Sequence, residues 1–280
     1  MKTQKPTFSC EFFPPKTEKG QENLEATLVA LKPLKPEYIS CTYGAGGTTQ
    51  EGTFEAIQHI QKHGIAAVPH MTCIGSTREK ISALLQQYKD TGCRSIVALR
   101  GDLPDGMEDP GEFQFANELV SFIREQTGDH FHIEVAAYPE KHPQSSSMQD
   151  ELVNYIRKVE AGADAAITQY FYNTDAWVRF VEDSERLGAN IPVIPGIMPI
   201  TNYKQLARFS ASCGAEIPRW ITSRLEGFGD DIESIRAFGF DVTLQLCEQL
   251  LDAGAPGLHF YSMNRAEPTL QLCQELGLGK

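Results

Sequence analysis

Short β-rich runs recur eight times along the chain, and segments of helical period lie between them. In one such segment Leu152, Ile156 and Val159 repeat at helical spacing, and Thr77 precedes another as a candidate N-cap. Eight strand–helix units close a (β/α)8 TIM barrel, whereas open doubly wound sheets have about five to seven strands. We therefore predict an α/β fold of the (β/α)8 barrel type. The predicted strands are Phe8–Phe13, Tyr38–Tyr43, Ala66–Ile74, Ser95–Leu99, His132–Ala137, Ala165–Tyr172, Pro192–Ile197 and Gly257–Tyr261.

The length of the chain agrees with one barrel. It has 280 residues, and no linker rich in Gly, Ser or Pro divides it. We expect a single catalytic domain over residues 1–280. The stretch from Ile200 to Ala253 is longer than one crossover needs, so an additional element is expected at Trp220–Phe228.

Charge and hydropathy argue against two classes of partner. Lys and Arg number 25 and Asp and Glu number 37, which gives a formal net charge of −12 without any basic run, so a nucleic-acid partner is not expected. No stretch approaches the roughly 20 uninterrupted apolar residues of a membrane span. Residues 1–5 lead directly into the first predicted strand without a signal-peptide core. We expect a cytoplasmic protein without a membrane partner.

The cysteines argue against a disulfide framework or a zinc site. There are seven, an odd number, and none belongs to a CxxC pair. Cys10, Cys41 and Cys73 lie in apolar runs, where we expect them to be small buried side chains. We expect no metal ion.

Glu11 lies in an apolar run, where an ionisable side chain is costly unless something pairs with it or uses it. Pro14 and Pro15 stop the predicted strand, which places Glu11 near its carboxyl end. Enzymes built on parallel strands carry their chemistry at that end. Glu11 is therefore a candidate acid, and a structural carboxylate paired with a buried Arg or a backbone N–H is the alternative.

Polar residues follow most of the other predicted strands as well. Taken singly, a strand-end His is more often structural than catalytic, and a turn can hold a local ion pair. Their placement on one rim of a barrel is more specific. These positions are Thr42-Tyr43-Gly44-Ala45, His70-Met71-Thr72, Arg100-Gly101-Asp102, Tyr138 to Pro143, Gln169, and Tyr261 to Arg265.

The segment after the fifth strand contains a possible anion site. Asn154, Arg157 and Lys158 have the spacing i, i+3, i+4, which predicts one helix face turned away from the apolar positions. Two cations and an amide could hold a phosphate or a diphosphate. A solvated helix surface explains the same spacing. Fingerprints of a Rossmann site, a P-loop, an HExxH zinc site and a nucleophile elbow are absent from the sequence.

Taken together, these motifs resemble the bacterial methylenetetrahydrofolate reductase family, in order from the first strand to about Glu267. The resemblance rests on Glu11-Phe12-Phe13-Pro14-Pro15, Thr42-Tyr43-Gly44-Ala45, Pro69-His70, Ala98-Leu99-Arg100-Gly101-Asp102, Ala136-Ala137-Tyr138-Pro139-Glu140, Ile167-Thr168-Gln169, Ile194 to Pro199, and His259-Phe260-Tyr261. It implies a flavin barrel enzyme in which hydride from NADH or NADPH passes through FAD to 5,10-methylenetetrahydrofolate. The product would be 5-methyltetrahydrofolate, which feeds methionine synthesis. The resemblance further implies a homo-oligomer, a tetramer by analogy.

The resemblance also implies roles for individual residues. Glu11 would be the general acid that opens the folate ring to an iminium. Asp102 would hold the pterin and tune the flavin. Gln169, Gln205, Phe209 and Arg265 would join Asp102 in meeting the folate, and Thr42 would meet the nicotinamide. FAD contacts would come from Tyr43, Ala45, His70, Arg100, Gly101, Asp102, Ala116, Tyr138, His142, Ser145, Glu151, Asn154, Arg157 and Lys158.

The sequence departs from the family pattern at a few positions. Ser145 replaces an expected small apolar residue, and Glu151 is one methylene longer than the usual Asp. Three other classes remain as alternatives: a pterin-binding barrel methyltransferase without flavin, an aldolase or isomerase of sugar phosphates, and a non-catalytic binding barrel. A diphosphate site at Arg157 and Lys158 argues against the flavin-free methyltransferase. The loops after the last two strands lack the glycine-rich phosphate cradle expected of a sugar-phosphate aldolase or isomerase.

Overall fold

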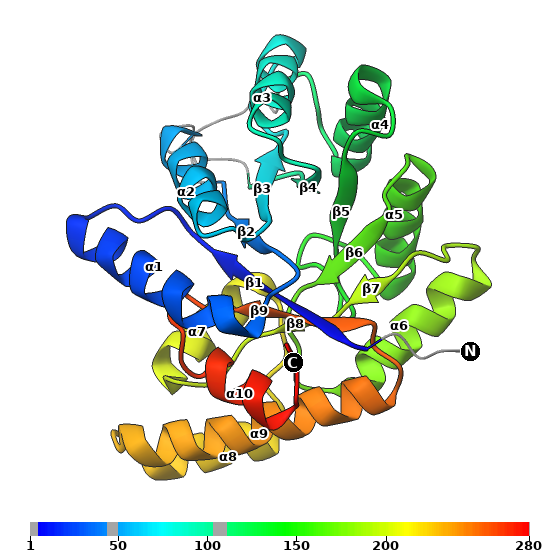
Figure 1. Cartoon of the computed structure of the whole chain (residues 1–280). Coiled ribbons are helices and arrows are strands. Elements are labelled where there is room, and N and C mark those ends of the chain that lie inside the picture. The colour runs from blue at the N-terminus through cyan, green and yellow to red at the C-terminus, as the bar shows by residue number, and fades with distance from the viewer. Residues whose placement is uncertain (1–4, 44–49, 103–110, 280) are drawn as a thin grey trace.

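A computed structural model describes residues 5–43, 50–102 and 111–279. Within these residues, parallel strands form a barrel that helices surround (Figure 1). This confirms the predicted fold class. The strands are β1 (Thr7–Phe12), β2 (Ile39–Cys41), β3 (Ala67–Thr72), β4 (Ser95–Leu99), β5 (His132–Ala137), β6 (Ala165–Thr168), β7 (Val193–Ile194), β8 (Gly196–Ile197) and β9 (Gly257–Tyr261).

The strand order shows how the barrel closes. The order is β7-β6-β5-β4-β3-β2-β1-β9-β8 with every pairing parallel, and β7 and β8 follow each other in the chain. The predicted strand Pro192–Ile197 is therefore two short segments on either side of Pro195, which has no N–H for a ladder. One segment pairs with β6 and the other with β9, and together they are the seventh strand of an eight-stranded barrel. The predicted strand Ala165–Tyr172 was too long, since β6 ends at Thr168.

The helices follow the strands in the expected alternation. Thr77 is the predicted N-cap of α3, and its side chain accepts a hydrogen bond from the N–H of Lys80. The additional element expected at Trp220–Phe228 is present as α8. The helices are α1 (Glu18–Leu31), α2 (Gln50–Lys62), α3 (Arg78–Asp90), α4 (Ala116–Thr127), α5 (Met148–Glu160), α6 (Thr174–Arg186), α7 (Tyr203–Cys213), α8 (Arg219–Phe228), α9 (Ile232–Asp252) and α10 (Thr269–Glu275), with a short 3-10 helix, η1, at Lys32–Leu34.

Alternate residues of each strand face two different environments. The outward residues, such as Phe8, Cys10 and Phe12 of β1, belong to the large apolar cluster between the strands and the helices. A second, small apolar cluster fills part of the barrel interior and consists of Tyr38, Val68, Val97 and Ile167, with Leu99 packed against it. The other inward positions include Ser9 and Glu11, so β1 is apolar outside and polar inside.

Two further expectations concern the described residues. None of their helices is long and apolar enough to cross a membrane. All seven cysteines have free thiols, and Cys10, Cys41 and Cys73 are buried as predicted.

Candidate active site

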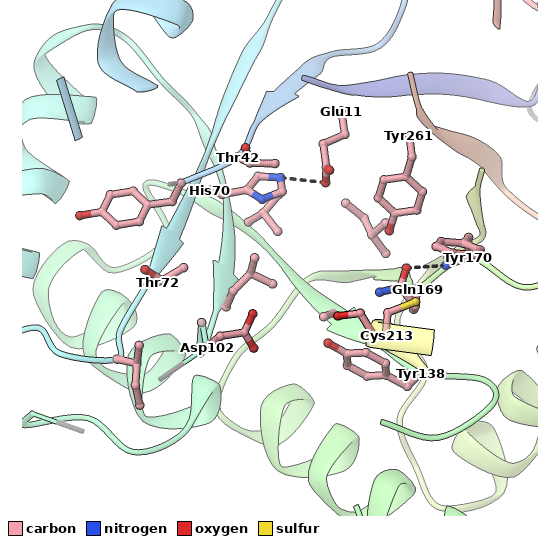
Figure 2. A pocket seen from close by; sticks show the side chains of 18 of the residues that line it. Glu11, Thr42, His70, Thr72, Asp102, Tyr138, Gln169, Tyr170, Cys213 and Tyr261 are labelled. Carbon is pink, nitrogen blue, oxygen red and sulfur yellow. Dashed lines mark hydrogen bonds and ion pairs between the residues drawn. The ribbon is translucent and has the colours of Figure 1, made fainter. Parts of the chain in front are cut away.

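A cavity of about 730 Å³ lies at the carboxyl ends of the barrel strands. Figure 2 shows how side chains from several strands point into it, among them Glu11 of β1, His70 of β3 and Tyr261 of β9. The predicted site residues that line this cavity are Glu11, Thr42, Tyr43, His70, Gly101, Asp102, Tyr138, Gln169 and Phe209. The prediction that strand-end residues meet on one rim is therefore confirmed for these positions, except Phe209, which comes from the helix Tyr203–Cys213.

Glu11 lies on the inner wall of this cavity. Its Oε2 is 3.6 Å from Nε2 of His70, and 24 % of its side chain is exposed. Burial disfavours the charged carboxylate and raises the pKa of Glu11 from 4.5 to about 8. Burial also lowers the pKa of His70 to about 3, so its ring is neutral. The arrangement leaves Glu11 protonated at neutral pH, as a general acid requires.

The loop after β9 fixes the end of the strand that carries Glu11. The side-chain amide of Asn264 donates to the carbonyl of Phe13 (2.7 Å) and accepts from the N–H of Phe13 (2.9 Å). Ser262 donates to the carbonyl of Glu11 (2.9 Å). These bonds replace the ladder contacts that end before Pro14 and hold the backbone of Glu11 in place.

The predicted folate residues divide between two adjoining cavities. Gln169 lines the large cavity, and its side-chain oxygen accepts a hydrogen bond from the N–H of Tyr170 (3.0 Å), as Figure 2 shows. Gln205 and Arg265 lie instead in a neighbouring cavity of about 200 Å³. Tyr261 lines both cavities, so the smaller one extends the larger.

A third cavity, of about 330 Å³, adjoins the first beside α5. It shares Gly101, Asp102 and Tyr138 with the large cavity. Most of the residues predicted to bind FAD line it: Arg100, Gly101, Asp102, Ala116, Tyr138, His142, Ser145, Glu151, Asn154 and Lys158. Ala45 and the preceding Gly44 lie outside the described residues.

The predicted common face of Asn154, Arg157 and Lys158 is only partly confirmed, since Asn154 and Lys158 line the third cavity and Arg157 does not. Asn154 and Arg157 are exposed and bonded to each other, whereas Lys158 is buried. Neighbouring residues of a helix point about 100° apart, so Arg157 and Lys158 cannot share one direction. α5 packs on the barrel through Glu151, Tyr155 and Lys158, and the apolar positions used for the prediction are only partly buried.

Lys158 is a buried cation beside the third cavity. Its Nζ donates to the carbonyl of Ala136 (2.5 Å). Burial lowers its pKa from 10.5 to about 8, and the nearby carboxylate of Glu151 opposes that shift. The ammonium therefore keeps its charge at neutral pH and is available to an anion in the cavity. Arg157 does not line the cavity.

Ser145 and Glu151, the two departures from the family pattern, contact each other. The hydroxyl of Ser145 donates to Oε2 of Glu151 (2.6 Å), and the N–H of His142 donates to the same oxygen (3.3 Å). The longer carboxylate thus ties the loop after β5 to α5. The pairing gives both residues a structural role at the edge of the third cavity.

Tyr261 and Thr72, which were expected on this rim without an assigned role, line the large cavity, whereas Cys213 was missed altogether. Tyr261 donates to the carbonyl of Thr168 (2.7 Å). Alternation along β3 gives a signal for Thr72, which lies two positions after His70. Cys213 comes from the end of α7, and no strand-end rule would find it.

The chain was compared with family models, curated proteins and solved structures. The family model "Methylenetetrahydrofolate reductase" matches residues 1–277. This chain belongs to the methylenetetrahydrofolate reductase family. It is an oxidoreductase, as the names of its curated relatives in this family indicate.

Three relatives illustrate the range of the family. The 5,10-methylenetetrahydrofolate reductase of Pectobacterium carotovorum is 39 % identical over 96 % of this chain and 90 % of its own length. The Escherichia coli enzyme of the same name is 38 % identical with the same coverage. The methylenetetrahydrofolate reductase (NADH) 1 of Arabidopsis thaliana is 38 % identical over 97 % of this chain but only 48 % of its own length.

A solved structure supports the fold independently. A Clostridium thermocellum protein, described as binding two copies of 5-methyl-5,6,7,8-tetrahydrofolic acid, superposes with a TM-score of 0.69. The match covers 98 % of this chain and 95 % of that protein at 17 % identity. At this identity the likeness concerns the fold alone.

Proposed function

We propose that this chain reduces 5,10-methylenetetrahydrofolate to 5-methyltetrahydrofolate, with NADH or NADPH as the hydride donor and FAD as the bound cofactor. The observation that carries the proposal is Glu11, an acid with a pKa of about 8 at the strand-end cavity of a chain in this family. The folate-binding description of the Clostridium thermocellum protein and the name of the Arabidopsis relative support folate and NADH as ligands.

The proposed role of Glu11 follows from its protonation state. Its proton is transferred to the amine nitrogen of the five-membered folate ring, which opens to an electrophilic iminium. Because the neutral acid is the stable form in this wall, the proton is present before the folate arrives. Burial disfavours the carboxylate that remains, and this favours its reprotonation.

The residues present fit a flavin dinucleotide. The cavities of about 730 and 330 Å³ share a wall, and the second offers the guanidinium of Arg100 and the ammonium of Lys158 to phosphates. Gly101 between them has φ +83°, and a Cβ there would come within 3.0 Å of Thr72. When bound, FAD would accept hydride from the nicotinamide and pass it on to the folate.

Asp102 and Gln169 are proposed to orient the folate. Asp102 is exposed where the two cavities meet, so its charge can act on both ligands. Gln169 turns its side-chain oxygen to Tyr170, which leaves its NH2 group as a donor toward the cavity. Phe209 on α7 lines the same cavity and offers an aromatic face.

The experiment is to compare the two half-reactions of Glu11→Gln by stopped-flow absorbance. Reduction of the flavin by the nicotinamide should change less than about threefold, while reoxidation by methylenetetrahydrofolate should slow by about 10²–10⁴-fold, because only the second step needs the acid. Equal slowing of both half-reactions would reject this role for Glu11.

Two controls separate the parts of the proposal. Glu140→Gln removes another carboxyl near the rim and should leave both half-reactions within about twofold of wild type. The purified protein should show a visible flavin spectrum. A colourless protein that binds no added FAD would instead favour the flavin-free alternatives.

A further inference from the structure

The third cavity contains an arginine whose side chain is held by a second loop. Arg100 follows β4, and its Nη2 donates to Oε1 of Gln144 in the loop after β5 (2.6 Å). Its Nε donates to the carbonyl of Gly101 (3.1 Å). Arg100, Gly101 and Gln144 all line the third cavity. The guanidinium is therefore fixed between two segments that lie 44 positions apart in the chain.

Both acceptors that hold this guanidinium are uncharged. A carboxylate partner would offset the positive charge. Among the described residues Arg100 forms no ion pair, although Asp102 lines the same cavity. Its other N–H groups and the NH2 group of Gln144 have no partner within this part of the chain. The pair thus offers a full positive charge and several donors, which suit phosphate oxygens.

The loop that carries Gln144 is itself tightly bonded. The N–H of Gln144 donates to Nδ1 of His142 (3.1 Å), and the ring of His142 packs edge-on against Tyr138, with centroids 4.7 Å apart. The N–H of Ser145 donates to the carbonyl of His142 (2.9 Å), and Nζ of Lys141 donates to the carbonyl of Ser145 (3.0 Å). Because its backbone is held in this way, Gln144 presents its side chain from a fixed position.

A purely structural tie between β4 and this loop is the alternative. The loop already has other attachments, since the side chain of Ser145 and the N–H of His142 both donate to Glu151 of α5. The bond between Arg100 and Gln144 is also exposed, and such bonds contribute little to folding stability. The fold therefore has little need of Gln144, whereas a ligand in the cavity would meet the group that it holds.

We propose that Gln144 is a positioning residue, which holds the guanidinium of Arg100 in the orientation that binds a phosphate of the flavin dinucleotide. The inference rests on the proposed function, in which FAD lies partly in the third cavity. A free arginine side chain loses rotamer freedom when it binds a ligand, and this loss weakens binding. Because Gln144 restricts the guanidinium beforehand, less freedom is lost when FAD binds.

The second cation of this cavity is held in a similar way. Nζ of Lys158 donates to the carbonyl of Ala136, another uncharged oxygen. Two cations, each fixed by a neutral acceptor, are arranged before any ligand is present. Preorganised donors of this kind suit a diphosphate, which has two charged groups to bind.

A double-mutant cycle on the full-length protein tests the role of Gln144. Flavin-loaded protein is diluted in steps, and the fluorescence of the released FAD gives the dissociation constant. Gln144→Met keeps the length of the side chain and should raise this constant about three- to tenfold. Arg100→Met should raise it about tenfold or more. Adding Gln144→Met to Arg100→Met should change it less than about twofold, because no guanidinium is left to position.

Gln249→Met provides the matched control. Gln249 is an exposed glutamine of α9, and its Oε1 accepts a hydrogen bond from Thr174 (2.9 Å), but it does not line the third cavity. This variant should leave the dissociation constant of FAD within about twofold of wild type. Thermal melts of all the variants should stay close to wild type, since Gln144 is exposed as well.

The outcomes separate this inference from the proposed function. If Gln144→Met weakens FAD binding equally with Arg100 and with Met at position 100, the glutamine acts through its loop and the positioning role is overturned. An unchanged dissociation constant in the single Gln144→Met variant would also overturn it. In both cases wild type still binds FAD, so the proposed function stands. If wild type binds no added FAD, the proposed function fails, and the inference fails with it.

Discussion

The outer and inner faces of the barrel strands differ in polarity. Along β1, Phe8, Cys10 and Phe12 point outward into the apolar cluster under the helices, while Ser9 and Glu11 point into the barrel. The outer face is continuous and apolar from Phe8 to Leu278. Among the described residues, the inner face has a small apolar cluster and several buried polar groups, among them Ser9, Glu134 and His259. Alternation along one strand thus places residues that stabilise the fold and residues that line the barrel interior at adjacent positions.

The largest effect should come from removing an aromatic ring on the outer side. Phe180 of α6 is buried against Tyr155, with ring centroids 5.0 Å apart. Phe180→Ala should lower the free energy of unfolding by about 3–5 kcal/mol, because the cavity cannot collapse fully. Chemical denaturation measures this. Phe209→Ala, the same change at the partly buried rim, should cost under about 2 kcal/mol and weaken folate binding instead. Equal losses of stability in Phe180→Ala and Phe209→Ala would contradict the difference between the packed outer face and the rim.

The next effect concerns pH and an inner acid. Glu134 faces Tyr38, Glu37 and His132, and burial raises its pKa from 4.5 to about 7. Since the folded state holds this proton more firmly than the unfolded chain, the group's contribution to stability is complete below about pH 4.5 and is lost as pH rises to about 7. Glu134→Gln mimics the neutral acid. Its unfolding free energy relative to wild type should therefore increase by up to about 3 kcal/mol between pH 5 and 8.

Denaturation at a series of pH values tests this expectation. The variant Glu125→Gln changes an exposed carboxylate on α4 and should show no such trend. A constant difference between Glu134→Gln and wild type across the pH range would mean that the inner acid is not held in its neutral form.

Lys158 tests the comparison between the two faces in a third way. It lies on α5, outside the barrel strands, yet it lines the third cavity. Lys158→Met keeps the buried stem and removes the charge, so the fold should retain its stability. Affinity for FAD should fall by about 2 kcal/mol, the range for a hydrogen bond to a charged group. Flavin retention after gel filtration and dilution reports this. The exposed neighbour provides the control, since Arg157→Met should cost less than about 1 kcal/mol. Equal losses of FAD affinity in the two variants would restore the hypothesis that Arg157 and Lys158 hold the diphosphate together.

The smallest effect is expected at the rim. Asp102→Asn removes a negative charge where the two cavities meet, and we expect a flavin potential more positive by about 20–30 mV, which is on the order of 1 kcal/mol for two electrons. Folate binding should weaken, while the melting temperature should not change because Asp102 is exposed. Potentiometric titration and thermal melts test both points, with Asp241→Asn on the surface of α9 as the control. A lower melting temperature at an unaltered potential would indicate a structural turn instead.

Local patterns in the sequence were enough for much of the fold. The eight β-rich runs, the N-cap at Thr77 and the additional helix at Trp220–Phe228 depend on residues within about one turn or one strand of each other. The position of Glu11 near a strand end follows from the prolines after it. The failures are also local in origin. A single proline divides the seventh strand, and α5 buries a lysine where a polar face was predicted.

By itself, the sequence determined the alternation of strands and helices, the two faces of each strand, and the rim on which the acid and its neighbours lie. These depend on backbone geometry that repeats every two or every 3.6 residues. Only the tertiary structure decided which inner residues touch. Ser9 meets His259 across 250 positions, because the barrel closes with one register between β1 and β9. Tyr38 meets Glu134 across 96 positions, because the residue before β2 and the strand β5 both face the barrel interior. Burial then sets the protonation of Glu11, since desolvation depends on everything packed around a group and not on its neighbours in the chain.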